Sequence, residues 1–153
     1  MPVLTVPSPV GTLTLTEQDG HLTQLSWYAS TEREETLLLR EARNQLAAYF
    51  AGRLKYFDLP LKPHGSRFCQ SVWAAMQRIP FGETRSYGEI AHETNSAPRA
   101  VGGACGKNPI AIIVPCHRIL GSGRGIGGYS GGEGLRTKQF LLTLEHAKFR
   151  AVA

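Results

Sequence analysis

The sequence predicts an α/β protein of the α+β kind, in which a small antiparallel sheet with one helix precedes a mostly helical part. Residues 3–28 contain short alternating segments separated by a turn signal, as in antiparallel strands. Residues 31–51 repeat apolar side chains every three to four positions, as in a helix. Residues 63–153 contain several short helical segments separated by glycine and proline. With 153 residues, the chain is long enough to bury a substantial core.

The sheet is expected at the beginning of the chain. Leu13 and Leu15 alternate with threonines, a period of two that suits a half-buried strand. Asp19-Gly20 is a hairpin turn signal, so the chain should return after it as a neighbouring strand. The expected strands are 3–6, 12–16 and 21–28.

A helix is expected to follow the sheet. Thr31 is a suitable N-cap, three glutamates come directly after it, and Gly52 is a stop signal. The helix should therefore cover residues 31–51. This first part, residues 1–62, contains no obvious chemistry and is interpreted as a support domain.

Residues 60–65 are a natural linker, and the second part, residues 63–153, should be mostly helical. Ser86 or Thr84 can cap a short helix, and Pro98 can begin another one after a tight turn. Two short helices joined in this way predict a helix-turn-helix. The expected helices are 68–79, 86–92, 98–107 and 135–146.

The expected helix over 98–107 is unusually smooth, because residues 99–106 include three glycines and little bulk. Each glycine costs a helix about 1 kcal/mol relative to alanine. Such a helix makes sense if its face must approach another surface closely. A DNA minor groove and a tightly packed neighbouring helix are the two alternatives.

The charge of the chain is divided unevenly. Residues 1–62 carry 6 Lys+Arg against 7 Asp+Glu, whereas residues 63–153 carry 11 against 5. A basic part is typical of a protein with a polyanionic partner such as nucleic acid, because phosphate contacts release counterions. An ordinary solvated basic surface is the alternative.

The composition argues against several classes of protein. Three cysteines, Cys69, Cys105 and Cys116, are too few and too odd for a disulfide framework, and indicate free thiols in a reducing compartment. No run of about 18 apolar residues predicts a membrane span, and the first residues do not read as a secretion signal. We therefore expect a cytoplasmic protein with no membrane partner.

The strongest chemical signal is Cys116, which follows the apolar run 110–114 and Pro115 and precedes His117 and Arg118. The run is expected to be a buried strand. A thiol fixed after it, with an imidazole to take its proton, is a candidate nucleophile. No second Cys/His pair has zinc spacing, so no metal site is expected.

Eight glycines follow within residues 121–134. A dinucleotide-binding pattern occurs among them, but it does not open a helix, so a flexible wall beside a pocket is the better interpretation. A merely mobile connection is the alternative.

Together these motifs resemble those of the O6-alkylguanine-DNA alkyltransferase family, also called methylated-DNA–protein-cysteine methyltransferases. The resemblance covers residues 66–147 and centres on Val114-Pro115-Cys116-His117-Arg118-Ile119. The other matching segments, in the family's order, are Ile79-Pro80-x-Gly82-Glu83, Ser86-Tyr87-Gly88, Arg99-Ala100-Val101-Gly102, Asn108-Pro109, Gly128-Tyr129-Ser130-Gly131-Gly132 and Leu141-Leu142-x-x-Glu145.

The resemblance implies a ribonuclease H-like first domain over 1–62 and a winged-helix-like DNA-binding and alkyl-acceptor domain over 63–153. It implies DNA repair by direct reversal: an alkyl group moves from O6 of guanine in duplex DNA, with O4 of thymine left open, to Cys116 after nucleotide flipping. The transfer would be stoichiometric and irreversible and would need no cofactor. The expected partner is double-stranded DNA containing O6-alkylguanine, bound by a monomer in the bacterial or archaeal cytosol, with cooperative binding left open.

The resemblance also implies residue roles. His117 would deprotonate Cys116 through a water, Glu145 would orient His117, Asn108 would hold the turns, and Tyr87 would donate to the purine ring. The expected substrate contacts are the Val114 carbonyl, the Cys116 N–H, the Ser130 N–H and Tyr129. Arg99 would replace the flipped base, and the expected DNA contacts are Ser86, Arg99, Ala100, Gly103, Lys107 and Arg118.

Two other classes of function are compatible with the same residues. A protein that binds alkylated DNA without repairing it would show salt-dependent binding but no transfer. A thiol hydrolase using Cys116, His117 and Glu145 would turn over many times.

Overall fold

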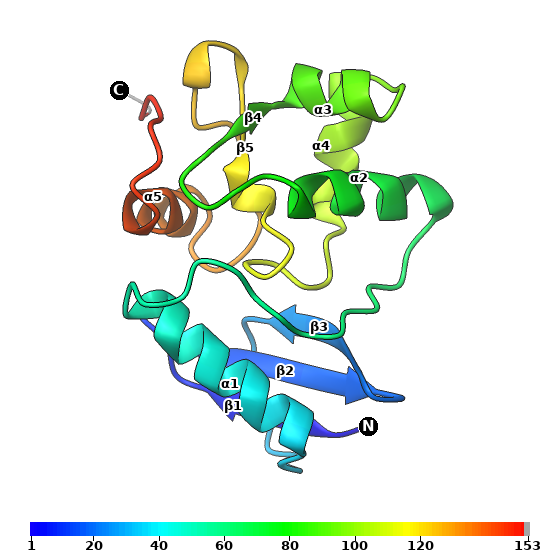
Figure 1. The fold of residues 1–153 in the computed structure, drawn as a ribbon, viewed down its shortest axis with the longest axis vertical. Helices are drawn as coiled ribbons and strands as arrows, with labels where there is room; N and C mark the ends of the chain where they lie inside the picture. The colour runs from blue at the N-terminus through cyan, green and yellow to red at the C-terminus, as the bar shows by residue number, and fades with distance from the viewer. Residues whose placement is uncertain (152–153) are drawn as a thin grey trace.

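The computed structural model describes residues 1–151 and confirms the α+β class. A three-stranded antiparallel sheet, in the order β1 (Val3–Val6), β2 (Leu13–Gln18) and β3 (His21–Ser26), forms the base of the molecule (Figure 1). Asp19 and Gly20 both have positive φ, 52° and 77°, as the predicted hairpin turn between β2 and β3 requires. Helix α1 (Leu37–Phe50) lies across one face of the sheet.

The predicted start of the first helix is wrong, because α1 begins at residue 37 and not at 31. Thr36 is the N-cap: its hydroxyl accepts from Leu39 N at 3.1 Å and donates to a Glu17 carboxylate oxygen. The segment before it follows the edge of the sheet, where Glu34 N donates to Val3 O at 2.9 Å. Pairing of this segment with the edge of the sheet is therefore more favourable than a helix that begins at residue 31, although such a helix would place the three glutamates at the positive end of its dipole.

The second part of the chain is mainly helical and meets the sheet along the edge strand β3, where Leu25 pairs with Ile110. It contains α2 (Arg67–Gln77), α3 (Tyr87–Glu93), α4 (Pro98–Gly106) and α5 (Leu135–Leu144). Two short strands, β4 (Arg85–Ser86) and β5 (Ile119–Leu120), pair in parallel, and two 3₁₀ turns are η1 (Cys116–Arg118) and η2 (Ser122–Arg124).

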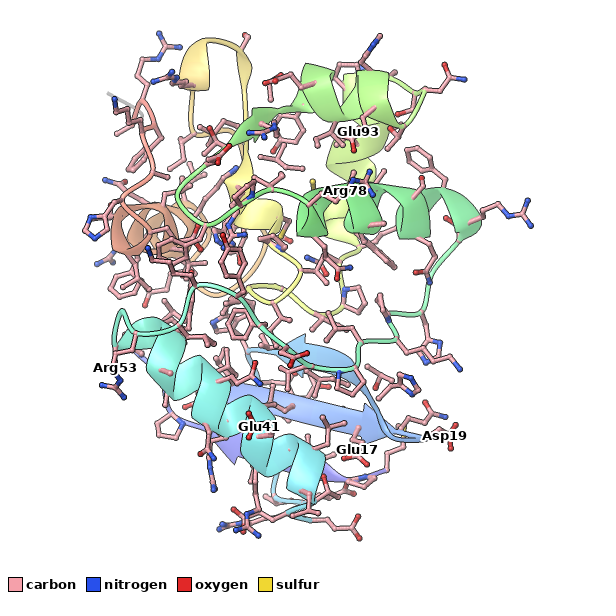
Figure 2. The ribbon with its side chains drawn as sticks, in the orientation of Figure 1. Glu17, Asp19, Glu41, Arg53, Arg78 and Glu93 are labelled. Carbon is pink, nitrogen blue, oxygen red and sulfur yellow. The ribbon has the colours of Figure 1, made fainter. Side chains whose placement is uncertain are left out.

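The predicted helix-turn-helix is present as α3 and α4. Ser86 caps α3 in a capping box, in which its hydroxyl accepts from Glu89 N and the Glu89 carboxylate accepts from Ser86 N. Pro98 occupies the first turn of α4. Arg78, the C-cap of α2, and Glu93 of α3 point toward one another and form an ion pair on the surface (Figure 2).

The expected strand over residues 110–114 is wrong, because this buried run forms a tight turn. Val114 N donates to Ile110 O at 2.9 Å, and Ile112 has a φ of +74°. A β-branched residue rarely adopts this conformation, so the turn must be imposed by its surroundings. The turn packs against the sheet, where Leu25 N donates to Pro109 O at 2.9 Å.

Candidate active site

The side chain of Asn108 holds the turn that precedes Cys116. Its amide oxygen accepts from Ile110 N at 3.0 Å, and its amide nitrogen donates to Val114 O at 2.8 Å. Cys116 N donates to the same carbonyl at 2.9 Å. One polar side chain thus fixes both ends of the turn, and the backbone of the cysteine is attached directly to it.

Cys116 is only 8% exposed and lies on the wall of a cavity of about 930 Å³. The cavity is bounded by the start of α3, one side of α4 and the glycine-rich segment 121–131, as predicted for a pocket wall. Its lining residues are Ser86, Tyr87, Gly88, Pro98, Arg99, Gly102, Cys105, Gly106, Cys116, Gly121, Ser122, Gly128, Tyr129, Ser130 and Gly131.

His117, the residue after Cys116, is completely buried and is oriented by Glu145. His117 Nε2 lies 2.7 Å from Glu145 Oε2, so Nε2 carries the proton and donates it to the carboxylate. The other ring nitrogen, Nδ1, is buried and has no hydrogen-bond partner within the described residues. This tautomer leaves a free lone pair on Nδ1, which can accept a proton.

Glu145 is also bound by Arg118. Arg118 Nε and Nη2 donate to its two carboxylate oxygens at 2.8 and 3.0 Å, and Nη1 donates to Ile79 O at 2.7 Å. The sequence predicts Arg118 as a phosphate contact, and this prediction is wrong for the structure. The Arg118 side chain is 6% exposed, and its guanidinium is engaged inside the protein.

Burial and charge set the ionisation of these groups. Burial raises the pKa of Glu145, but hydrogen bonds and charges from His117 and Arg118 outweigh it and lower the pKa from 4.5 to about 2. Burial lowers the pKa of His117 below 6.5, although Glu145 opposes the change. Burial raises the pKa of the Cys116 thiol above 9.0, against the effects of Asn108 and Lys138. The thiol therefore needs a base, and the next residue in the chain carries a neutral imidazole.

Lys138 is a site residue that sequence reasoning missed. Its ammonium is fully buried and donates to Ile119 O at 2.6 Å and to Gly128 O at 3.1 Å. Nζ also lies 5.9 Å from the centre of the Tyr87 ring. Burial lowers its pKa from 10.5 to about 8, while the two cavity cysteines oppose the shift. The available signal was spacing, since Lys138 precedes Glu145 by two helical turns and should share its buried face.

The glycine-rich wall is shaped by close packing. A Cβ on Gly131 would lie 2.5 Å from the Trp27 ring of the first part, and Gly127 has a φ of +71° beside Tyr87. Trp27 also packs edge-on against Tyr129, with ring centres 6.4 Å apart. These contacts indicate an ordered pocket wall and not a merely mobile connection.

The cavity brings together most, but not all, of the predicted substrate contacts. Tyr87, Tyr129 and Ser130 line it, and the Tyr129 hydroxyl is buried without a hydrogen-bond partner within the described residues. Val114 is fully buried, and its carbonyl already accepts from Asn108 and from Cys116 N. The prediction that the Val114 carbonyl and the Cys116 N–H read the base is therefore not met in this conformation.

The outer face of α4 opens beside the cavity. Val101 and Ala104 are buried, whereas Arg99, Ala100 and Gly103 are exposed. A Cβ on Gly103 would meet nothing within 4 Å, so close packing within the described residues does not explain the glycine. Of the two alternatives for this smooth helix, approach to an external surface is the one that the structure supports. Lys107, the C-cap of α4, is also exposed.

Residues 1–151 include no group of three His, Cys, Asp or Glu side chains arranged to hold a metal ion. None of the helices in that range is both long and apolar enough to cross a membrane. The site is that of a cysteine nucleophile with an imidazole–carboxylate pair, set beneath a helix-turn-helix surface.

Comparisons with known proteins identify the family. The family model described as "6-O-methylguanine DNA methyltransferase, ribonuclease-like domain" matches residues 4–63, and the one described as "6-O-methylguanine DNA methyltransferase, DNA binding domain" matches residues 67–147. The chain therefore belongs to the 6-O-methylguanine DNA methyltransferase family, and the resemblance noted in the sequence is confirmed.

Individual relatives match over nearly their whole length. The methylated-DNA–protein-cysteine methyltransferase of Mycolicibacterium paratuberculosis is 49% identical over 150 residues, which is 92% of this chain and 90% of that protein. The constitutive Bacillus subtilis protein of the same name is 41% identical over 159 residues, with 95% and 96% covered. The structure of Mycobacterium tuberculosis OGT in complex with DNA superposes with a TM-score of 0.86 at 45% identity, covering 95% of this chain and 93% of that one.

Proposed function

We propose that the protein repairs DNA by transferring an alkyl group from O6 of guanine to its own Cys116. One observation carries the assignment of the acceptor: Cys116 is the cavity thiol that directly precedes the buried His117–Glu145 pair. The curated relatives are named methylated-DNA–protein-cysteine methyltransferases, and a similar structure is described in complex with DNA. Both fit a protein of this kind.

The chemistry balances within the site. The thiol proton passes to His117 Nδ1 by way of a water, and Glu145 stabilises the imidazolium that forms. The sulfur then attacks the alkyl carbon while the carbon–oxygen bond breaks. The departing guanine anion takes a proton at a ring nitrogen from the Tyr87 hydroxyl and is stabilised by the Ser130 N–H at its oxygen. The Tyr87 phenolate then recovers a proton through water as the His117 imidazolium releases the proton that it took from the thiol. The products are a thioether and an intact guanine, and no step regenerates the thiol.

The DNA is expected to lie on the outer face of α4. In this arrangement the small residues Ala100 and Gly103 let the helix enter the minor groove, and Ser86 and Lys107 contact the backbone. Arg99, at the rim of the cavity, takes the place of the flipped nucleotide in the stack. We expect a monomer to act on each lesion, in the cytoplasmic compartment where the DNA is.

Intact-mass spectrometry after mixing with duplex DNA that contains O6-methylguanine tests the proposal. Cys116 should gain about 14 Da, the exchange of hydrogen for methyl, with an endpoint of one equivalent. Cys116→Ala should bind the same DNA without gaining mass, because its phosphate contacts lie elsewhere. Folded protein that binds the DNA but never gains mass would contradict the proposal, and more than one turnover would indicate a thiol hydrolase.

A further inference from the structure

A tyrosine of the first part of the chain enters the active site. Tyr49 lies near the end of α1, is fully buried, and donates its hydroxyl to Glu145 Oε2 at 2.6 Å. The same oxygen accepts from His117 Nε2 at 2.7 Å. Tyr49 and Glu145 are 96 residues apart, so this hydrogen bond connects the two parts of the chain at the side chain that orients the base.

We infer that Tyr49 is a positioning residue for the proposed alkyl transfer: its hydroxyl fixes Glu145, and through it the orientation and basicity of His117 beside Cys116. The inference rests on the proposed function. The sequence alone indicates only a support domain for residues 1–62. According to this inference, one side chain of that domain also influences the reaction.

The carboxylate of Glu145 is held by more donors than a simple pair with His117 would need. Oε2 accepts from Tyr49, His117 and Arg118 Nη2, and Oε1 accepts from Arg118 Nε. A carboxylate bound on both oxygens cannot rotate freely, so the direction of its bond to His117 is fixed. Because Nε2 points to Glu145, the proton acceptor must be Nδ1, which has no hydrogen-bond partner among residues 1–151.

The Tyr49 hydroxyl also moderates the charge that His117 feels. A donor to a carboxylate withdraws some of its negative charge, which weakens its pull on the imidazole proton. Burial raises the pKa of Tyr49 far above 10.0, and the charge of Glu145 raises it further, so the hydroxyl remains a donor across the working pH range. The bond is therefore a constant element of the site.

The position of the hydroxyl is fixed by aromatic packing. The Tyr49 ring lies 5.2 Å from the Phe50 ring, 5.3 Å from the Phe57 ring and 6.3 Å from the Phe81 ring, measured between centres. Phe81 belongs to the second part, so the ring is clamped from both sides of the junction. A buried tyrosine hydroxyl usually has a hydrogen-bond partner, and the partner of Tyr49 is the oxygen that also binds His117.

Besides Tyr49, several charged or titratable groups surround Glu145 and contribute to the pH profile of the reaction. His117 and Arg118 face the carboxylate from η1, and Tyr49 faces it from α1. Lys138 of α5 acts on His117, and Cys116 and Tyr129 complete the same electrostatic cluster. Lys55 and His146 line a further cavity together with Glu145.

The test is the single-turnover rate of transfer by Tyr49→Phe, measured with duplex DNA containing O6-methylguanine from about pH 5 to about pH 9. The rate constant should fall about tenfold near neutral pH, which is the effect of about one hydrogen bond. The acidic limb of the profile should also move up by about half a pH unit, because Glu145 keeps more charge and raises the pKa of His117. The final extent of transfer should stay at one equivalent per protein molecule. This result would show that the lower rate constant does not come from a fraction of unfolded protein.

Two controls separate positioning from stability. Tyr56→Phe removes the hydroxyl of a tyrosine that is 67% exposed and should behave as the unaltered protein does. Leu39→Ala removes a fully buried side chain near the start of α1, away from Tyr49 near its end, and should lower the melting temperature while leaving the acidic limb in place. An unshifted limb in Tyr49→Phe, or the same shift in Leu39→Ala, would overturn the inference. Absence of transfer in the unaltered protein would instead overturn the proposed function.

Discussion

At the scale of single residues, the site is built from buried polar groups that bind one another and the nearby backbone. Asn108 and Lys138 each bind two backbone groups at the site, and Arg118 binds Glu145 with two nitrogens. Removing one member leaves its partners buried and unsatisfied, which costs more than the bond itself contributes. Changes at these residues should therefore affect both stability and transfer.

Asn108→Ala should destabilise the protein by about 2 to 4 kcal/mol, because Ile110 N and Val114 O both lose their partner. The turn before Cys116 should loosen, so transfer should slow as well. Urea unfolding and single-turnover rates measure the two effects. Asn44→Ala, an exposed change in α1, is the control. A fully stable Asn108→Ala protein would show that the turn does not depend on this side chain.

Lys138→Met should slow transfer at neutral pH by about tenfold, because the nearby positive charge that favours the Cys116 thiolate is lost. The pKa of Cys116 should rise, so the deficit should shrink as the pH is raised. The rate of Cys116 alkylation by iodoacetamide as a function of pH measures this. Lys62→Met, at an exposed lysine of the linker, should leave the profile unchanged. A pH-independent deficit would indicate a purely structural role.

At the scale of elements, α4 packs against the protein with one face and is expected to bind DNA with the opposite face. Its buried face carries Val101 and Ala104, whereas Gly103 faces outward with free space around it. Gly103→Leu should therefore keep or raise stability, by up to about 1 kcal/mol, since leucine is the better helix former. The same change should abolish tight binding to duplex DNA. Thermal unfolding and a binding titration test both halves, with Ala47→Leu in α1 as the control. Unimpaired binding to duplex DNA would show that α4 does not lie in the DNA groove.

Arg99 is placed at the start of the same helix and at the rim of the cavity. Arg99→Ala should impair repair of duplex DNA by about tenfold or more, because nothing then fills the stack in place of the flipped nucleotide. Reaction with a free O6-alkylguanine base needs no flipping and should be nearly unaffected. Parallel rate measurements on the two substrates decide the point. An equal loss on both would refute the finger role.

The same scale shows what sequence could and could not predict. The strands, the hairpin turn and the helix-turn-helix follow from local periodicity, caps and turn residues, and these predictions are confirmed. The start of α1 is decided by a distant partner, the edge of β1, and the turn over 110–114 by the nearby Asn108 side chain. Periodicity of apolar residues registers neither contact. The prediction of Arg118 as a phosphate contact is wrong for a similar reason. The sequence does not show that the arginine binds the buried carboxylate of Glu145, 27 residues further along the chain.

At the scale of the whole molecule, the two parts of the chain meet at the active site. Leu25 N binds Pro109 O, Trp27 packs against Tyr129, and Tyr49 binds Glu145. Each contact joins a residue before position 62 to one after position 100. Sequence motifs lie within one segment, so Tyr49 could be recognised only once the fold brought it to Glu145. The free energy of unfolding and the rate of alkyl transfer should therefore both depend on the same buried ionisable groups.

The pH dependence of stability should report these groups. The folded state lowers the pKa of His117 below 6.5 and that of Glu145 from 4.5 to about 2, so the unfolded chain binds more protons in acid. The contribution of His117 is complete above pH 6.5 and is lost as the pH falls below it, and that of Glu145 is lost from pH 4.5 toward pH 2. The free energy of unfolding from urea titrations should therefore decline steadily from about pH 7 to about pH 4. His117→Gln keeps a donor for Glu145 but cannot titrate, so its decline should be shallower between about pH 6.5 and about pH 5. Equal slopes in the two proteins would mean that His117 is not buried in its neutral form.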